Sequence, residues 1–421
     1  MNEPINILLI NGPLPPPYGG VSSYLSHTLP YLASRGFVIH TIMDKKPANK
    51  LQYSEFEKYG IHIHYGGGNR LQKIVRILKY LPLWITLAGK SRLPLLYLLK
   101  TIASQASWIE ITEKIIQRYP IDILHAYDYP WIQGFVALYV AKKYGKKSIQ
   151  TTFGEVVPHM EELTQHDAMG QRYKHLVTEV LKEFDCVVTL SKHCAKELQT
   201  VGLSSNHIRV TYYGVDLTKY KPSNDGLKAR EHFKIGTRPT ILFVGHIRPR
   251  KGPQILLESI PNIVKEIPDV LVIFVGPDYG ILDQLKKRGE FLNITSNILF
   301  TPPLPDSTVI SLYAACDIFA FPSCTAIECF GLSMVQAMAC AKPVVGSNID
   351  GIPEVIVDGE TGFLVPPGNE VELGKRLIQL LKNNHLREQM GRAGRLRTEE
   401  LFNQDKRVGE LEKLYREFVQ H

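Results

Sequence analysis

Short apolar runs recur along the 421-residue chain, separated by longer stretches in which apolar residues return every three or four positions. Apolar runs of about four to eight residues bounded by Gly, Pro or polar residues are typical of buried strands, and the longer period is typical of helices. Strands that alternate with helices predict parallel, doubly wound α/β sheets. The expected strands are 5–10, 37–43, 121–125, 148–152, 186–190, 240–244, 270–275, 298–300, 318–321 and 344–345.

This alternation occurs twice, in two halves of similar size. Residues 220–226 read Tyr-Lys-Pro-Ser-Asn-Asp-Gly, which is typical of a linker. We therefore expect one Rossmann-like domain over 1–215 and a second over 216–398. The last periodic segment, Glu399–Val419, is rich in charge and predicts a long terminal helix within 399–421.

Composition is ordinary for a soluble globular protein, with 44% hydrophobic and 21% charged residues. No apolar run approaches the ~18 residues of a membrane-spanning helix. The N-terminus has a short apolar run and no leading basic residues, which fits a first strand better than a signal peptide. The six cysteines show no metal-ligand spacing. We expect free, buried thiols in a reducing compartment, and therefore a cytoplasmic protein.

The net charge of +8 is unevenly distributed, because residues 66–109 contain no Asp or Glu. Within them Arg70, Lys73 and Lys79 alternate with apolar residues in a helical period. A basic amphipathic segment over 69–105 suits an anionic membrane surface, and residues 70–100 would make that contact. The alternative is a solvated helix packed on the first domain. Nucleic-acid binding is not expected, because no motif of a known nucleic-acid-binding module is present.

The most informative segment is 318–354, where an apolar strand ends at Phe321 and a loop carries Glu328. Gly331 then opens an amphipathic helix over Leu332–Cys340. The first turn of a helix presents unpaired N–H groups that suit a phosphate. Ligands of open α/β sheets bind at the carboxyl ends of the strands. We therefore expect a ligand with phosphate and hydroxyl groups at this position.

The same segment resembles the E-x7-E signature of the retaining GT-B glycosyltransferases of family 4, also called glycosyl transferases group 1. The second glutamate of that signature is replaced by Gln336. The resemblance implies two Rossmann-like domains that face a cleft, with a C-terminal helix that crosses back to the first domain. The matching positions are Pro322, Ser323, Glu328, Phe330, Gly331, Ala337, Met338, Ala339, Pro343, Val344 and Val345, with further landmarks at 17–21, 188–192, 213–216, 243–252 and 359–367.

The resemblance also implies how a nucleotide sugar would be held. When the sugar leaves, the diphosphate carries negative charge, which a metal or a pair of cations must neutralise. Arg248, Arg250 and Lys251 follow an expected strand, and Lys251 aligns with the family's phosphate-binding lysine. The family's arginine falls at His246, so Arg248 could supply the second charge. The alternative is a set of solvated basic residues at a helix start. Glu328 would bind the sugar hydroxyls, unless it is a surface carboxylate. The remaining donor-binding positions implied are Gly19, Gly20, Gly245, Phe330, Gly331, Leu332 and Gln336.

Acceptor-side residues are expected at two strand ends of the first domain. His125 is in register with a family histidine, although a core hydrogen-bonding role fits it equally well. Tyr127 and Phe153 occur where the family carries its acceptor-side histidine. Asp128 and Glu155 are the carboxylates left to orient or deprotonate an acceptor hydroxyl, with Asp128 counted among the catalytic candidates.

We therefore expect a metal-independent, retaining glycosyltransferase that needs no cofactor beyond its nucleoside diphosphate sugar. The expected acceptor is a glycan or lipid-linked saccharide of cell-envelope synthesis, reached at the inner face of the plasma membrane. Loops near 302–304 and His246 are expected to surround the donor base. The main alternative is a non-catalytic GT-B protein that binds a nucleotide sugar without turnover, and an epimerase or phosphorylase on this fold is a third option. The departures that motivate the non-catalytic alternative are Tyr127, Phe153, His246 and Gln336.

Overall fold

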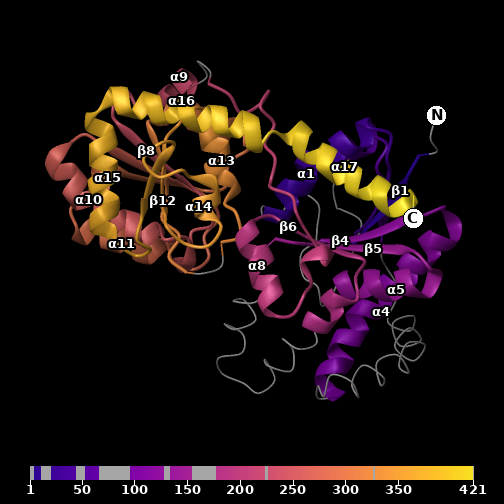
Figure 1. The fold of residues 1–421 in the computed structure, drawn as a ribbon. Helices are drawn as coiled ribbons and strands as arrows, with labels where there is room; N and C mark the ends of the chain where they lie inside the picture. Colours follow the sequence, from indigo (N-terminus) through magenta and orange to yellow (C-terminus); the bar gives the residue numbers. More distant parts are fainter. Residues whose placement is uncertain are drawn as a thin grey trace. The chain divides into compact units, whose positions relative to one another are not determined.

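The chain folds into two compact units, each built on a parallel sheet (Figure 1). The computed structural model describes residues 4–10, 20–43, 53–65, 95–127, 133–153, 177–222, 226–325 and 328–420. Unit 1 comprises 1–211 and 407–421, and unit 2 comprises 212–406. The sequence predicts the corresponding boundaries at 215/216 and 398/399.

Seven strands form the sheet of unit 1, in the order β3-β2-β1-β4-β5-β6-β7 with every pair parallel. Both faces are covered by helices, so most strand residues are buried, including polar ones such as His40, His125 and Gln150. The order reverses between β1 and β4, which makes their carboxyl ends the topological switch point. The strands are β1 Asn6–Ile10, β2 Val38–Met43, β3 His62–Tyr65, β4 Ile123–Tyr127, β5 Lys147–Thr152, β6 Cys186–Thr189 and β7 Ile208–Val210.

Helices pack on both faces of this sheet. On one face Leu124 and Ala126 join a core with α4 and α5. Because side chains alternate along a strand, His125 and Tyr127 face the other side, where the last helix brings Tyr415 into contact with both. The helices of unit 1 are α1 Gly20–Ser34, α2 Ser54–Lys58, α4 Leu95–Arg118, α5 Phe135–Tyr144, α8 Lys192–Thr200 and most of α17 Gln404–Gln420, with a 3₁₀ turn at Ser205–His207.

Unit 2 has a six-stranded parallel sheet in the order β10-β9-β8-β11-β12-β13. Its order reverses between β8 and β11. Helices α10 and α15 pack together over one face and share a core with the strands (Figure 1). The strands are β8 Thr240–Val244, β9 Leu271–Val275, β10 Ile298–Thr301, β11 Ile318–Phe321, β12 Val344–Ser347 and β13 Gly362–Val365.

Local signals fix the ends of several helices in unit 2. Asn369 caps α15 by accepting from the N–H of Glu372 at 2.9 Å, and Asn383 caps α16 by accepting from Leu386 at 3.0 Å. Pro253 occupies the first position of α10, where its missing N–H costs nothing. The helices are α9 Gly226–His232, α10 Pro253–Glu266, α11 Leu282–Phe291, α12 Asp306–Ala315, α13 Leu332–Ala339, α14 Ile352–Val355, α15 Glu370–Lys382 and α16 Asn384–Leu401, with 3₁₀ turns at Pro249–Lys251 and Thr295–Asn297.

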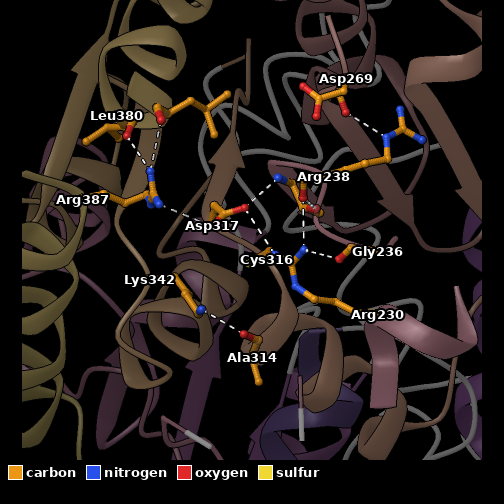
Figure 2. A network of polar contacts seen from close by, with 12 residues as sticks. Arg230, Gly236, Arg238, Asp269, Ala314, Cys316, Asp317, Lys342, Leu380 and Arg387 are labelled. Atoms are coloured by element: carbon orange, nitrogen blue, oxygen red, sulfur yellow. Dashed lines mark hydrogen bonds and ion pairs between the residues drawn. The ribbon is translucent and has the colours of Figure 1, made fainter. Parts of the chain in front are cut away.

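A polar network holds the amino-terminal edge of this second sheet (Figure 2). Asp317 precedes β11 and accepts from the N–H of Thr240 at 2.7 Å, and its carboxylate lies 3.4 Å from Arg230 and 3.7 Å from Arg387. Arg387 also donates to the carbonyls that end α15, and Lys342 donates to the carbonyl of Ala314 at the end of α12. Cations at helix C-termini are favourable. The network therefore ties four helices to the edge opposite the strand carboxyl ends.

The predicted fold class is confirmed. Each expected strand has a counterpart whose ends differ by at most two residues, and β3, β7 and β13 were not expected. Three details were wrong. The terminal helix is divided between Leu401 and Gln404, because the buried Phe402 accepts from the N–H of Val215 at 2.8 Å. Helix α13 is buried throughout Met334–Ala339 rather than amphipathic. Cys324 is partly exposed, although all six cysteines are free.

The predicted membrane-binding segment lies mostly outside the described residues, which resume at Leu95 with α4. None of the helices within the described residues combines the length and the apolar composition that crossing a membrane requires.

Candidate functional site

Two loops meet at the switch point of unit 2. One follows β8, and the other follows β11. Gly252, at a φ of +72°, comes so close to the second loop that a Cβ there would lie 1.8 Å from the carbonyl oxygen of Pro322. The N–H of Cys324 donates to the carbonyl of Arg250 at 3.0 Å. The close approach needs a glycine, and it brings the residues of the two loops into one site.

An ion pair joins the two loops. The Lys251 ammonium contacts the Glu328 carboxylate, and their side chains are only 21% and 12% exposed. Ser323 donates to the same carboxylate at 3.3 Å, and the ammonium lies 5.5 Å from the centre of the Phe321 ring. The N–H of Glu328 donates to the carboxylate of Asp350 at 3.2 Å. A cation and a carboxylate, both expected at the donor site, are thus held side by side at the carboxyl end of β11.

Helix α13 directs its N-terminus toward the same strand end. Gly331 precedes the helix with a φ of +85°, and a Cβ there would lie 2.4 Å from Cε of Met334. Among the described residues, no side chain caps this helix start. The N–H of Met334 donates to the carbonyl of Gly331 at 3.1 Å, which leaves the N–H groups of Leu332 and Ser333 at the helix start available to an anion. The neighbouring Phe330, expected at the donor site, is buried and packs on Tyr212 and Phe402.

The remaining basic residues surround the end of β8. His246 stacks on Tyr279 with ring centres 4.6 Å apart, and the Arg248 guanidinium lies 5.2 Å from the same ring. Nε of Arg250 is buried and has no acceptor among the described residues. Buried N–H groups are almost always paired, so this one is consistent with an anionic ligand. Gly276, at a φ of +150°, permits the close approach to Gly245, because a Cβ on Gly276 would lie 1.9 Å from the carbonyl oxygen of Gly245.

Tyr279 was missed by the sequence analysis. It follows β9 in a Gly-Pro-Asp-Tyr-Gly turn, and 51% of its surface is exposed. A large aromatic residue inside a turn that follows a buried strand is the signal that could have identified it, because a ring in that place has no strand neighbour to cover it.

Gln336, expected to hold the donor ribose, points into the interior of unit 2. It is 8% exposed. Its amide oxygen accepts from the hydroxyl of Tyr313 at 3.0 Å, and its amide nitrogen donates to the hydroxyl of Tyr220 at 2.9 Å. Burial raises the pKa of both tyrosines well above the usual value. In this arrangement the amide links two neutral phenols inside the unit.

The acceptor-side candidates of unit 1 are also internal. His125 is fully buried, with Nδ1 2.7 Å from the Tyr415 hydroxyl and Nε2 2.7 Å from the Thr151 hydroxyl. Burial lowers its pKa to about 3. This is the core hydrogen-bonding arrangement that the sequence left open. Tyr127 is fully buried and stacks on His125, and the partly buried Phe153 lies 6.1 Å from Tyr127.

Three expected site residues, Gly19, Asp128 and Glu155, lie outside the described residues. Gly20 is the first residue of α1. Within the parts of the chain that the structure describes, no group of three or more His, Cys, Asp or Glu side chains could hold a metal ion.

Two family models match the chain in succession. Residues 18–219 match the model described as Glycosyltransferase Family 4, and residues 226–397 match the model described as Glycosyl transferases group 1. An uncharacterized glycosyltransferase of Methanocaldococcus jannaschii is 28% identical over 243 residues, which cover 57% of this chain and 60% of the relative. A D-inositol 3-phosphate glycosyltransferase of Corynebacterium glutamicum is 32% identical over 194 residues, which cover 44% of this chain and 46% of the relative.

The matched regions thus span about half the length of these curated relatives. Among solved structures, Anabaena Alr3699/HepE in complex with UDP aligns over 98% of this chain and 100% of its own, with a TM-score of 0.77 and 18% identity. That likeness concerns the fold.

Proposed function

Since the chain belongs to the family 4 glycosyltransferases with the GT-B fold, we propose that it transfers a sugar from a nucleoside diphosphate sugar to a hydroxyl group. The observation that carries this proposal is the Lys251–Glu328 ion pair beside the free N-terminus of α13, at the switch point of β8 and β11. A cation, unpaired N–H groups and a carboxylate match the diphosphate and the hydroxyls of such a donor.

In the proposed reaction, the bond between the anomeric carbon and the diphosphate oxygen breaks while the acceptor oxygen forms the new bond on the same face. The proton of the acceptor hydroxyl passes to the departing diphosphate. Lys251, Arg248 and Arg250 would neutralise the charge that grows on this leaving group, as a metal ion would otherwise do. The reaction would thus retain configuration and require neither a metal nor a further cofactor. Glu328 would hold the hydroxyls of the transferred sugar.

The proposed acceptor is a glycan or a lipid-linked saccharide of the cell envelope, met on the cytoplasmic side of the membrane. The basic segment 69–105 supports this part of the proposal, because it combines cations with apolar residues. Replacing Lys73, Arg76 and Lys79 with Glu should abolish binding to vesicles that contain anionic lipid. Unchanged vesicle binding would remove the membrane contact from the proposal.

A second candidate function is the binding of a nucleotide sugar without turnover. Two observations favour it: the amide of Gln336 is held between Tyr220 and Tyr313, and His125 is fully buried. Neither residue reaches a ligand in that arrangement. The retained Lys251 and Glu328 favour the transferase instead.

A donor screen distinguishes the two. The purified chain is incubated with UDP-, GDP- and ADP-sugars, with and without a chelator, and the release of nucleoside diphosphate is measured. Release from one donor that persists with chelator is the expected result. Tight binding of a donor without release, even with added lipid extract as a source of acceptors, would favour the non-catalytic protein.

A further inference from the structure

A third loop contacts Glu328, in addition to the loops that follow β8 and β11. Strand β12 pairs with β11, so the loop that follows β12 begins at the same edge of the sheet. From this loop the Asp350 carboxylate accepts from the N–H of Glu328 at 3.2 Å, and the N–H of Gly351 donates to the carbonyl of Glu328 at 3.2 Å. Both polar backbone groups of Glu328 are thus bound by two consecutive residues of one loop.

The backbone conformation of Asp350 is unusual for its place in the fold. Its φ is +55°, in the left-handed region that residues other than glycine rarely adopt. Four non-glycine residues among the described ones have a positive φ. Lys234, Asn293 and Ala341 follow the ends of helices α9, α11 and α13, where this conformation is common. Asp350 instead follows a strand.

Capping of the next helix does not explain this conformation. Gly351 is the residue that precedes α14, and no side chain of the described residues caps that helix start. A non-glycine residue in the left-handed region costs free energy and persists where the surrounding structure fixes it, often at functional sites. The printed partner of the Asp350 carboxylate is the backbone of Glu328. The strained residue is therefore tied directly to the candidate site.

The two ends of Glu328 are held by different groups. Its carboxylate contacts the Lys251 ammonium and accepts from Ser323 at 3.3 Å, whereas its backbone is bound by Asp350 and Gly351. A diphosphate that binds Lys251 would take the ammonium away from the carboxylate. The backbone anchor does not involve Lys251, so it would remain. Because the allowed rotamers of a side chain depend on its backbone, this anchor limits where the carboxylate can move.

We propose that Asp350 is a positioning residue, which fixes the backbone of Glu328 so that its carboxylate stays in place for the sugar hydroxyls once the diphosphate occupies Lys251. This inference rests on the function proposed above. Asp350 would act through its acceptor oxygen and through Glu328, without touching the donor. Asparagine should therefore replace it, because its amide oxygen also accepts and because it tolerates a left-handed φ. Glycine would keep the φ and lose the acceptor.

The test compares Asp350→Asn and Asp350→Gly with the wild type, and adds Asp350→Gly to Glu328→Gln. Asn293→Gly is the matched control, because Asn293 has nearly the same φ, +56°, but is exposed and follows α11. The rate of nucleoside diphosphate release is measured at saturating donor to give kcat. Calorimetry gives the affinity for the free nucleoside diphosphate, and urea denaturation shows that each variant is folded.

Asp350→Gly should lower kcat about tenfold, because a misplaced catalytic group loses rate. Its affinity for the free nucleoside diphosphate should stay as in the wild type, since Lys251 and the start of α13 remain. Asp350→Asn and Asn293→Gly should turn over as the wild type does. In the Glu328→Gln background, Asp350→Gly should cause no further loss, because the two residues act as a unit.

Three results would overturn the inference while leaving the proposed function intact. The first is a wild-type kcat for Asp350→Gly. The second is an Asp350→Asn variant as slow as Asp350→Gly, since the charge of Asp350 would then matter. The third is a further tenfold loss in the Glu328→Gln background, since Asp350 would then act independently of Glu328. A wild type that binds a donor and releases no nucleoside diphosphate would refute the proposed function, and the role of Asp350 with it.

Discussion

The ion pair between Lys251 and Glu328 predicts opposite effects on diphosphate binding for its two residues. Without ligand, the carboxylate is the counterion of the ammonium. A diphosphate that binds Lys251 must therefore compete with Glu328 for the same cation. Glu328→Gln removes the competitor and keeps the size of the side chain, so diphosphate should bind more tightly. Lys251→Met removes the cation and keeps the apolar stem, so diphosphate should bind more weakly.

The burial of the pair sets the size of these effects. Fully exposed pairs contribute about 0–1 kcal/mol, and this pair is 21% and 12% exposed. We take about 1 kcal/mol as the free energy of the ion pair that a bound diphosphate must give up. Without that cost, Glu328→Gln should bind pyrophosphate or nucleoside diphosphate about fivefold more tightly. A charge-assisted bond is worth about 1.5–3 kcal/mol, so Lys251→Met should lose at least about tenfold.

Titration calorimetry with pyrophosphate and with the preferred nucleoside diphosphate measures both effects. Raising the salt concentration should shrink the gain of Glu328→Gln, because screening weakens the competing pair. Neither ligand carries the sugar that Glu328 would hold, so a loss of sugar contacts does not enter the result. If Glu328→Gln weakens pyrophosphate binding as much as Lys251→Met does, the carboxylate holds the diphosphate site together, and the assigned roles are wrong.

Three further predictions concern the glycine contact, Gln336 and His125. Gly252→Ala should separate the two loops and so reduce nucleoside diphosphate affinity at least about tenfold. The control Gly236→Ala has a similar φ of +61° and open space around it, so it should only cost about 1 kcal/mol of folding stability. Equal nucleoside diphosphate affinities for the two variants would exclude the loop contact as the cause. Gln336→Leu should lower the free energy of unfolding by about 2–4 kcal/mol in urea denaturation, because the buried Tyr220 and Tyr313 hydroxyls lose their hydrogen bonds to the amide. A side chain that served the ligand alone would leave stability unchanged. The folded pKa of His125, about 3, lies below the unfolded value of about 6.5, so the unfolded chain binds the extra proton as the pH falls below 6.5. This residue should therefore cost about 1.4 kcal/mol of stability between pH 7.5 and 5.5, and His125→Gln should show a correspondingly flatter pH dependence. Equal slopes for the two proteins would mean that the folded protein protonates this histidine as readily as the unfolded chain does.

Most of the fold could be predicted because parallel strands covered on both faces are apolar along their length, as in Ile318–Phe321 and Thr240–Val244. The three strands that were missed are short or partly polar, as in His62–Tyr65. The break at Phe402 depends on a backbone contact with Val215, which is 187 residues away in the sequence (402 − 215 = 187) and leaves no local signal.

The candidate site was predicted in part. Lys251 and Glu328 each follow a strand, and strand ends that share a sheet edge come together, so their meeting could be expected. Gln336 gave no such indication, because its partner Tyr220 lies 116 residues away. Tyr279 was missed because its exposure and its stacking on His246 are features that sequence periodicity does not report.

The central claim is that this chain transfers the sugar of a nucleoside diphosphate sugar at the Lys251–Glu328 site and releases the nucleoside diphosphate. The measurement that tests it most directly is the release of nucleoside diphosphate from the preferred donor by the wild type and by Glu328→Gln, with binding of the free diphosphate measured alongside. The account predicts release by the wild type, a loss of about 10²–10³-fold in rate for the variant, and retained diphosphate binding in both. Equal rates for the two proteins, or no release by a wild type that binds the donor tightly, would contradict it.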